Sequence, residues 1–311
     1  MEQEWQQVSR RRRGKSSKGR SHARSAAGRS PNTVANGEEE VEPVPEVSAE
    51  KQTQIIQRVR TIANVIRDAM LLKDALSVVT KHFELDAVKV KTPVDVDAEE
   101  ETEDGLTLVG YGIGSFCASS NAVHQLGFMV ALRDALCEGQ APNVKVAASL
   151  DEIQAEIFDP AMNKSDAAIA EHFQLKVIQE NEHGRRRVAS NTVFFMPHCG
   201  KTLYQNVLAC NWGPAIKKLI IIGNSFSAYG DRVLASKERL GLLLVSVLPY
   251  LEEVALSCGV AKNHEDFGRY EAAFNDLSVQ RFPSELLARG LQDTNLNEKM
   301  TVASSLKLPV K

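Results

Sequence analysis

Short runs of consecutive apolar residues alternate with segments of helical periodicity through the middle of the chain. We predict buried strands at residues 106–114, 154–159, 175–179, 192–197, 218–226 and 274–283. Helices are expected between them at residues 119–137, 164–173 and 201–210, and a long helical segment broken near Pro249 follows residue 226. This alternation predicts an α/β fold, a Rossmann-like, doubly wound and mainly parallel sheet of about five or six strands with flanking helices.

The segments outside this core have other patterns. Apolar residues recur every three or four positions from Ile55 to Met70, which predicts one amphipathic helix over residues 51–82. Sequence composition divides the chain into five parts. Residues 1–50 form a disordered tail that is basic and then acidic, and residues 51–91 form an amphipathic helical segment. An acidic linker at 92–104 leads to the main domain at 105–285, which a loose tail at 286–311 follows.

Composition and charge narrow the class of protein. The 311 residues are 43% hydrophobic and 25% charged with a net charge of -3, which gives no overall attraction to nucleic acid or membrane. The longest apolar stretch, 240–251, is shorter than the roughly 20 residues of a membrane-spanning helix. Five scattered cysteines without a CxxC pair indicate reduced thiols. We expect a cytoplasmic protein without a secretory signal.

A basic run at residues 10–29 raises the nucleus as a second compartment for this protein. It holds Arg10–Arg13 and further Lys and Arg residues but no acid. Such a run can act as a nuclear-import signal or a nucleic-acid contact, or it can be a solvated tail. The protein is then also nuclear if the run directs import, and nucleic acid is contacted through this tail if at all.

Glycine-rich and acidic residues follow the first two predicted strands. "GYGIG" places Gly110, Gly112 and Gly114 between a strand and a helix, where the backbone can approach a phosphate or ribose, although the spacing differs from GxGxxG. Asp159 ends the second strand and could accept ribose hydroxyls. A turn with only a structural role is the alternative for these glycines.

Polar residues also follow the third predicted strand. Glu180 and Asn181 open the stretch "ENEHG", which could contribute metal ligands or cap a helix. Capping or solvation is favoured because no second set of ligands is visible in the sequence. No metal site is therefore predicted.

The stretch "HCGK" follows the fourth predicted strand and comprises His198, Cys199, Gly200 and Lys201. Gly200 would free the backbone, and Lys201 at the start of a helix would add positive charge, so the turn predicts an anion site. Cys199 beside His198 could instead be an activated nucleophile.

The fifth predicted strand ends in one more polar turn. Gly223, Asn224 and Ser225 form it. Because the carboxyl ends of parallel strands share one edge of a sheet, we expect these residues and "HCGK" to lie together. The predicted ligand is a nucleotide-like or anionic small molecule.

Several motifs in series resemble the Sensitivity to Red Light Reduced family, the SRR-like proteins. They are "YGIGSF" (111–116), "QL" (125–126), "ENEHGRRRV" (180–188), "FFMPHCGKTLYQNVLACNW" (194–212), "IIIGNSF" (220–226) and "FNDLSVQRFP" (274–283). The resemblance implies roles in circadian-clock gene regulation and in haem biosynthesis, and implies no established reaction. This chain has Ala161 and Met162 where the family usually continues from its aspartate-proline strand end to an aromatic residue.

Two function hypotheses follow. The first is an intracellular regulatory protein, with possible protein partners, that acts in clock-linked and haem-linked pathways. The second is an enzyme that uses a nucleotide-type cofactor, such as an S-adenosylmethionine-dependent methyltransferase. The sequence assigns no catalytic residue and no cofactor. Direct haem binding through His198 or Cys199 is disfavoured because the chain lacks a Cys-Pro dipeptide.

Overall fold

A seven-stranded sheet forms the centre of the computed structural model, which describes residues 44–89, 105–138, 153–232 and 242–305. The strand order is β3-β2-β1-β4-β5-β7-β6. The strands are β1 (Leu106–Tyr111), β2 (Ile153–Phe158), β3 (Lys176–Val177), β4 (Asn191–Met196), β5 (Leu219–Asn224), β6 (Glu252–Ala255) and β7 (Leu277–Arg281). Neighbours from β3 to β5 are parallel, whereas β7 is antiparallel to both β5 and β6. The predicted α/β class and mainly parallel sheet are confirmed.

Each central strand supplies side chains to two separate hydrophobic clusters. Leu108 and Phe195 belong to one cluster, and Val109 and Phe194 belong to the other. All four side chains are fully buried. Because successive side chains of a strand point to opposite faces, helices must cover both faces of the sheet. This double burial explains why β1 and β4 are continuous apolar runs in the sequence.

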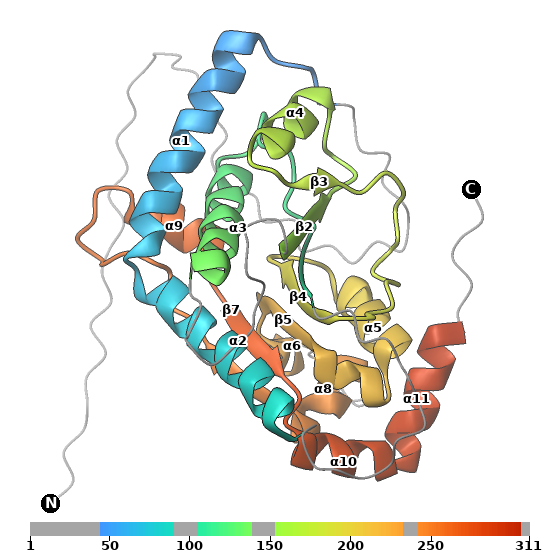
Figure 1. Ribbon diagram of the computed structural model, residues 1–311. Helices are drawn as coiled ribbons and strands as arrows, with labels where there is room; N and C mark the ends of the chain where they lie inside the picture. Colours follow the sequence, from blue (N-terminus) through green and yellow to red (C-terminus); the bar gives the residue numbers. More distant parts are fainter. Residues whose placement is uncertain (1–43, 90–104, 139–152, 233–241, 306–311) are drawn as a thin grey trace, which may run out of the picture. The chain divides into compact units, whose positions relative to one another are not determined.

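The first hydrophobic cluster lies under four main helices (Figure 1). These are α1 (Ala49–Arg67), α2 (Met70–Lys89), α3 (Ser120–Glu138) and α9 (Phe267–Phe274). Helix α4 (Lys164–His172) adds Ile169 and Ala170 to the same cluster. Helix α3 packs directly against α1, and a Cβ on Gly127 of α3 would lie 2.6 Å from Ile62 Cγ2. A residue without a side chain is therefore needed where these two helices touch.

The second hydrophobic cluster lies under other helices of the described residues. They are α5 (Lys201–Asn211), α6 (Phe226–Arg232), α8 (Leu243–Val247), α10 (Ser284–Gln292) and α11 (Thr294–Ser305), with short 3-10 helices at Pro214–Lys218 and Leu248–Tyr250. The chain around Pro249 is thus a 3-10 turn that leads into β6. No helix among the described residues is long and apolar enough to cross a bilayer.

Three local predictions differ from the structure. The single helix expected over residues 51–82 is two helices, because the chain turns at Asp68 and Ala69 between the buried residues Ile66 and Leu71. The apolar spacing continues across this turn and conceals it. The third strand is only two residues long, and β6 was not predicted at all.

The end of the described chain is helical rather than loose. Leu296 and Met300 of α11 are buried in the second cluster, and Trp212 Nε1 donates to Asn297 Oδ1 at 2.7 Å. Helix α10 contributes the buried Leu287. Helix α11 packs against α5 and α8, and α10 packs against α11, so burial between helices orders a segment whose sequence contains few apolar residues.

The end of the expected N-terminal tail is also ordered. Asn163 Nδ2 donates to the carbonyl oxygens of Val44 and Pro45 at 3.2 and 3.0 Å, and Val47 N donates to Ser165 Oγ at 3.1 Å. Helix α1 begins at Ala49, with Ser48 as its N-cap. The basic run at 10–29 and the acidic linker at 92–104 lie outside the described residues.

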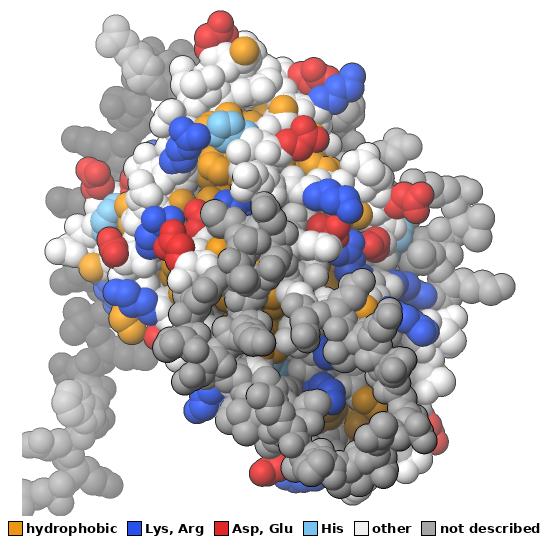
Figure 2. All heavy atoms as spheres, in the orientation of Figure 1, with side chains coloured by type: hydrophobic (Ala, Val, Ile, Leu, Met, Phe, Trp, Pro, Cys, Tyr) orange, Lys and Arg blue, Asp and Glu red, His pale blue; other side chains and the backbone are white. Residues whose placement is uncertain are grey.

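Charges of both signs are interspersed over the part of the surface that Figure 2 shows in colour. Lys and Arg side chains neighbour Asp and Glu side chains, in keeping with the net charge of -3. Attraction of a charged ligand to this face must therefore be local.

Candidate functional site

The carboxyl ends of β1, β2, β4 and β5 lie at one edge of the sheet because these strands are parallel. The chain moves outward from β1 to β2 and β3 and then returns to β4 on the other side of β1, so the strand order reverses between β1 and β4. In open α/β sheets, ligands bind beside such a reversal. We call the residues that follow these strands, 112–114, 159–161, 198–201 and 224–225, the carboxyl-edge turns.

The glycine turn after β1 is left-handed and packs tightly. Gly112 and Gly114 have φ angles of 69° and 84°, which glycine adopts without strain. A Cβ on Gly112 would lie 2.4 Å from Cys199 Sγ. Gly112 is thus required both by its backbone and by the side chain packed against it.

Gly110 does not belong to this turn. It lies within β1, and a Cβ at this position would lie 2.7 Å from Met129 Sδ of α3. Its role is close packing of α3 on the sheet. The structure thus gives Gly110 a packing role, because it precedes the end of the strand and faces a helix.

Asp159 holds the glycine turn in place. Its Oδ2 accepts from Gly114 N and its Oδ1 accepts from Ala161 N, both at 2.8 Å. A carboxylate has about four lone-pair sites, so two acceptor positions remain after these bonds. The structure therefore brings Asp159 and Gly114 together through a direct hydrogen bond.

His198, not Gly200, shapes the turn after β4. His198 has a φ of 54°, its N donates to Asn224 Oδ1 at 2.7 Å, and its Nε2 lies 3.1 Å from the Ala273 carbonyl oxygen. Gly200 has a φ of -70°, and nothing lies within 4 Å of a Cβ built there. The prediction that Gly200 frees the backbone is wrong, since an ordinary residue would fit.

Cys199 is a buried and neutral thiol. Its side chain is 7% exposed, and Sγ donates to the Tyr111 carbonyl oxygen at 3.3 Å. Burial raises the pKa of this thiol, and the charge of Asp159 raises it further. A nucleophilic thiolate needs the opposite shift, so this environment does not favour a thiol nucleophile at Cys199.

A buried polar network joins the turns after β4 and β5. Asn224 N donates to Tyr204 Oη at 2.8 Å, and Tyr204 Oη donates to the Met196 carbonyl oxygen. Tyr229 Oη donates to the Cys199 carbonyl oxygen at 2.6 Å. A Cβ on Gly223 would lie 2.6 Å from Tyr204 Oη, so Gly223 makes room for this hydroxyl. The network fixes the position of "HCGK".

Lys201 and Ser225 lie at the beginnings of helices. Lys201 is the first residue of α5 and is exposed. Ser225 Oγ accepts from Ala228 N at 3.1 Å and so caps α6, and Ser225 N donates to the Asp276 carbonyl oxygen at 2.8 Å. Lys201 therefore offers a charge to solvent at the carboxyl edge, whereas the Ser225 hydroxyl has a capping role.

Glu180 and Asn181 are exposed in the loop after β3. Asn181 Oδ1 accepts from His183 N at 2.9 Å, which makes a local turn in the loop. Among the described residues, no group of three or more His, Cys, Asp or Glu side chains is placed to hold a metal ion. In the described part of the chain, neither residue makes a hydrogen bond to the other candidates.

Sequence reasoning missed a half-buried charged network beside the glycine turn. Arg186 Nη2 donates to Glu182 Oε1 at 2.9 Å, and its Nη1 donates to Glu156 Oε2. Tyr111 Oη donates to Glu182 Oε2, and Lys176 Nζ lies 3.1 Å from Glu156 Oε1. One signal was available: Glu156 interrupts an apolar strand, and a buried acid requires a cationic partner.

Comparison with known proteins identifies the family. The SRR1 domain model matches residues 73–281, from α2 to β7. The SRR1-like protein of Mus musculus is 33% identical over 149 residues, which are 47% of this chain and 53% of that protein. The protein Sensitivity to Red Light Reduced 1 of Arabidopsis thaliana is 28% identical over 184 residues, which are 59% of this chain and 61% of that protein.

A third relative extends the comparison to insects. The SRR1-like protein of Drosophila melanogaster is 24% identical over 181 residues, or 58% of this chain and 56% of that protein. The chain thus spans about half to three fifths of the length of these relatives. No solved structure matches it. The resemblance in the motifs is confirmed by a match over most of the chain, and the protein belongs to the SRR1 family.

Proposed function

We propose that this protein is an intracellular regulatory protein that acts in circadian-clock gene regulation and haem biosynthesis and is controlled by a small anionic, nucleotide-like molecule. Membership of the SRR1 family supports the regulatory part. The name of the Arabidopsis relative refers to reduced sensitivity to red light, an input to which a regulatory protein would respond. The protein is cytoplasmic and enters the nucleus if its basic run directs import.

One observation supports the ligand: the carboxyl-edge turns meet where the strand order reverses. The order β3-β2-β1-β4-β5 supports a Rossmann-like sheet, a fold in which phosphates and riboses bind at this edge. Gly112 and Gly114 provide a backbone turn there, and Asp159 is held against that turn. Lys201 at the start of α5 supplies a positive charge for an anionic group.

A second candidate is an enzyme with a nucleotide-type cofactor, of the S-adenosylmethionine-dependent methyltransferase kind. The observation that favours it is the glycine turn at Gly112 and Gly114 with Asp159 after the neighbouring strand, the positions at which doubly wound folds hold a nucleotide cofactor. The support is an analogy of fold alone.

The test is a binding measurement on the purified chain with a panel of nucleotides and S-adenosylmethionine. Lys201→Ala should weaken binding of an anionic ligand by roughly 1–3 kcal/mol, the range for a hydrogen bond to a charged group. Stability should hardly change because this exposed side chain lies at a helix start, where a positive charge is poorly placed. Lys262→Ala, in an exposed loop before α9, is the control.

The regulatory part needs a cellular measurement. In cells that depend on this chain, Lys201→Ala should change the rhythm of a clock-gene reporter or the haem content, while Lys262→Ala should change neither. If Lys201→Ala loses ligand binding but changes neither the reporter rhythm nor the haem content, the ligand does not regulate the protein. Methyl transfer from S-adenosylmethionine to any acceptor would favour the second candidate.

A further inference from the structure

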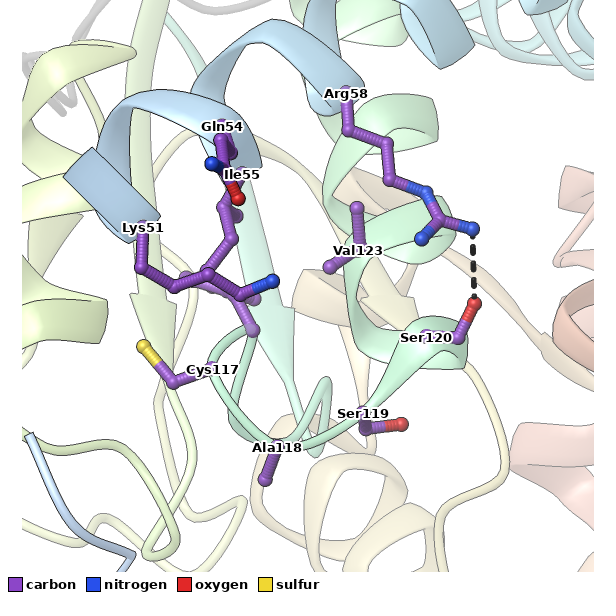
Figure 3. A pocket seen from close by; sticks show the side chains of 10 residues that line it. Lys51, Gln54, Ile55, Arg58, Cys117, Ala118, Ser119, Ser120 and Val123 are labelled. Atoms are coloured by element: carbon purple, nitrogen blue, oxygen red, sulfur yellow. Dashed lines mark hydrogen bonds between the residues drawn. The ribbon is translucent and has the colours of Figure 1, made fainter. Parts of the chain in front are cut away.

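A pocket of about 310 Å³ lies between α1 and the loop that leads into α3 (Figure 3). Its lining comes from α1, from this loop and from the first turn of α3: Lys51, Gln54, Ile55, Arg58, Phe116, Cys117, Ala118, Ser119, Ser120 and Val123. None of these residues belongs to the carboxyl-edge turns. The contribution of α1 also lies outside the SRR1 domain match, which begins at residue 73.

The charge of this pocket is positive. Lys51 and Arg58 are seven positions apart on α1, two helical turns, so they lie on one face of the helix. Both are exposed, and the ten lining residues include no acidic side chain. Burial raises the pKa of the Cys117 thiol to about 12, with a further contribution from its hydrogen bond to Asp166, so Cys117 adds no negative charge.

Hydroxyl groups at the start of α3 complete the polar lining. Ser119 Oγ accepts from Ala122 N at 3.3 Å and caps the helix. Arg58 Nη2 donates to Ser120 Oγ at 3.4 Å, so the guanidinium reaches across from α1 to α3, as the dashed line in Figure 3 shows. The 19 residues of α3 add the partial positive charge of a helix N-terminus to the two cations.

We propose that this pocket binds the phosphate group of a small phosphate monoester. Such a group carries about -1.5 to -2 charges at neutral pH and three acceptor oxygens. Lys51 would supply a point charge and Arg58 a planar pair of donors, as these side chains do in phosphate sites. The apolar side chains of Ile55, Phe116 and Val123 would face the organic part of the ligand. This site is additional to the one in the proposed function.

The experiment is isothermal titration of the full chain with phenyl phosphate and with inorganic phosphate at matched ionic strength. The double variant Lys51→Ala and Arg58→Ala should weaken binding of phenyl phosphate roughly tenfold or more, since two charge-assisted hydrogen bonds are lost. Lys51→Arg should retain binding because it keeps the charge. Phenyl phosphate should bind more tightly than inorganic phosphate, and equal affinities would overturn the monoester assignment in favour of free phosphate.

Two control variants test whether phenyl phosphate binds in this pocket, rather than by nonspecific attraction to surface charge or at the carboxyl edge. A double variant of Arg60→Ala and Lys73→Ala removes two exposed cations outside the pocket and should leave binding unchanged. The second control is Lys201→Ala: loss of phenyl phosphate binding in this variant, but not in the Lys51 and Arg58 double variant, would place the probe at the carboxyl edge and overturn the proposal. The proposal is overturned if neither probe binds in the millimolar range, or if the Lys51 and Arg58 double variant, with an unchanged melting temperature, binds as the unsubstituted protein does.

Discussion

Cys199 occupies the space that a side chain on Gly112 would need: a Cβ on Gly112 would lie 2.4 Å from Cys199 Sγ. The contact joins the end of β1 to the turn after β4, at the point where the strand order reverses. The Cys199 thiol also donates to the carbonyl oxygen of Tyr111, the residue before Gly112. Packing of these two turns is therefore part of the geometry of the candidate site.

We predict that Gly112→Ala destabilises the protein by roughly 2–4 kcal/mol, because it combines left-handed backbone strain with overpacking against the thiol. Cys199→Ala removes Sγ, so the double variant should lose less stability than the sum of the two single variants. Urea unfolding of the four proteins measures this coupling. Gly200→Ala should leave the free energy of unfolding nearly unchanged. An equal loss at Gly200 would contradict the assignment of strain and close packing to Gly112.

The buried Cys199 thiol should make stability fall at high pH. Its pKa in the folded protein is raised above the usual 9.0, so the unfolded chain releases this proton first as pH rises. The stabilisation is complete below pH 9 and decreases above it, by at most about 1.4 kcal/mol per pH unit for one group. Urea unfolding between pH 7 and about pH 10.5 should show that the free energy of unfolding declines less steeply with pH in Cys199→Ala than in the unsubstituted protein. Parallel curves for the two proteins would refute this linkage.

Tyr204→Phe should lower the free energy of unfolding by about 1–3 kcal/mol. The change leaves the Met196 carbonyl oxygen and Asn224 N without the hydroxyl that pairs with both. Tyr250→Phe is the matched control. The Tyr250 hydroxyl donates to Asp293 Oδ2 at 2.7 Å, in a more exposed position than the Tyr204 hydroxyl. Chemical denaturation of both variants provides the measurement. An equal loss of unfolding free energy at the two positions would show that the buried hydrogen bonds of Tyr204 stabilise the protein no more than an exposed one.

Arg186→Met should destabilise the protein more at pH 7 than at about pH 3.5. Burial raises the pKa of Glu156, but hydrogen bonds from Arg186 and Lys176 outweigh burial, and the net pKa lies below 4.5. The stabilisation from this carboxylate is therefore present above pH 4.5 and is lost as pH falls below it. Thermal unfolding at the two pH values tests the prediction.

The control for this network is Arg269→Met, which removes the exposed pair with Asp266 at the start of α9. Exposed pairs contribute about 0–1 kcal/mol, so its effect should be smaller at both pH values. A loss from Arg186→Met that does not depend on pH would mean that the arginine acts through packing rather than through Glu156.

Local sequence predicted every described strand except β6, and the helices between β1 and β5. Runs such as "TVFFM" in β4 are apolar on both faces, and a strand covered by helices on both sides is the structure that buries such a run. The placement of polar turns after β1, β2, β4 and β5 also follows from sequence, because these turns punctuate the apolar runs. The family resemblance rests on the same turns.

Long-range contacts decided the rest. Nothing near Glu156 indicates that Arg186, 30 positions away, pairs with it, and nothing in "HCGK" indicates that His198 is held by Asn224. Helix α11 is ordered by burial of Leu296 and Met300 rather than by a strong apolar pattern. The sequence by itself determined β1 to β5, β7 and the helices between β1 and β5, because local periodicity selects these segments. Only the tertiary structure decided the direction of β7, the partner of each charged group and the pocket between α1 and α3, because these depend on residues that meet only after the chain has folded.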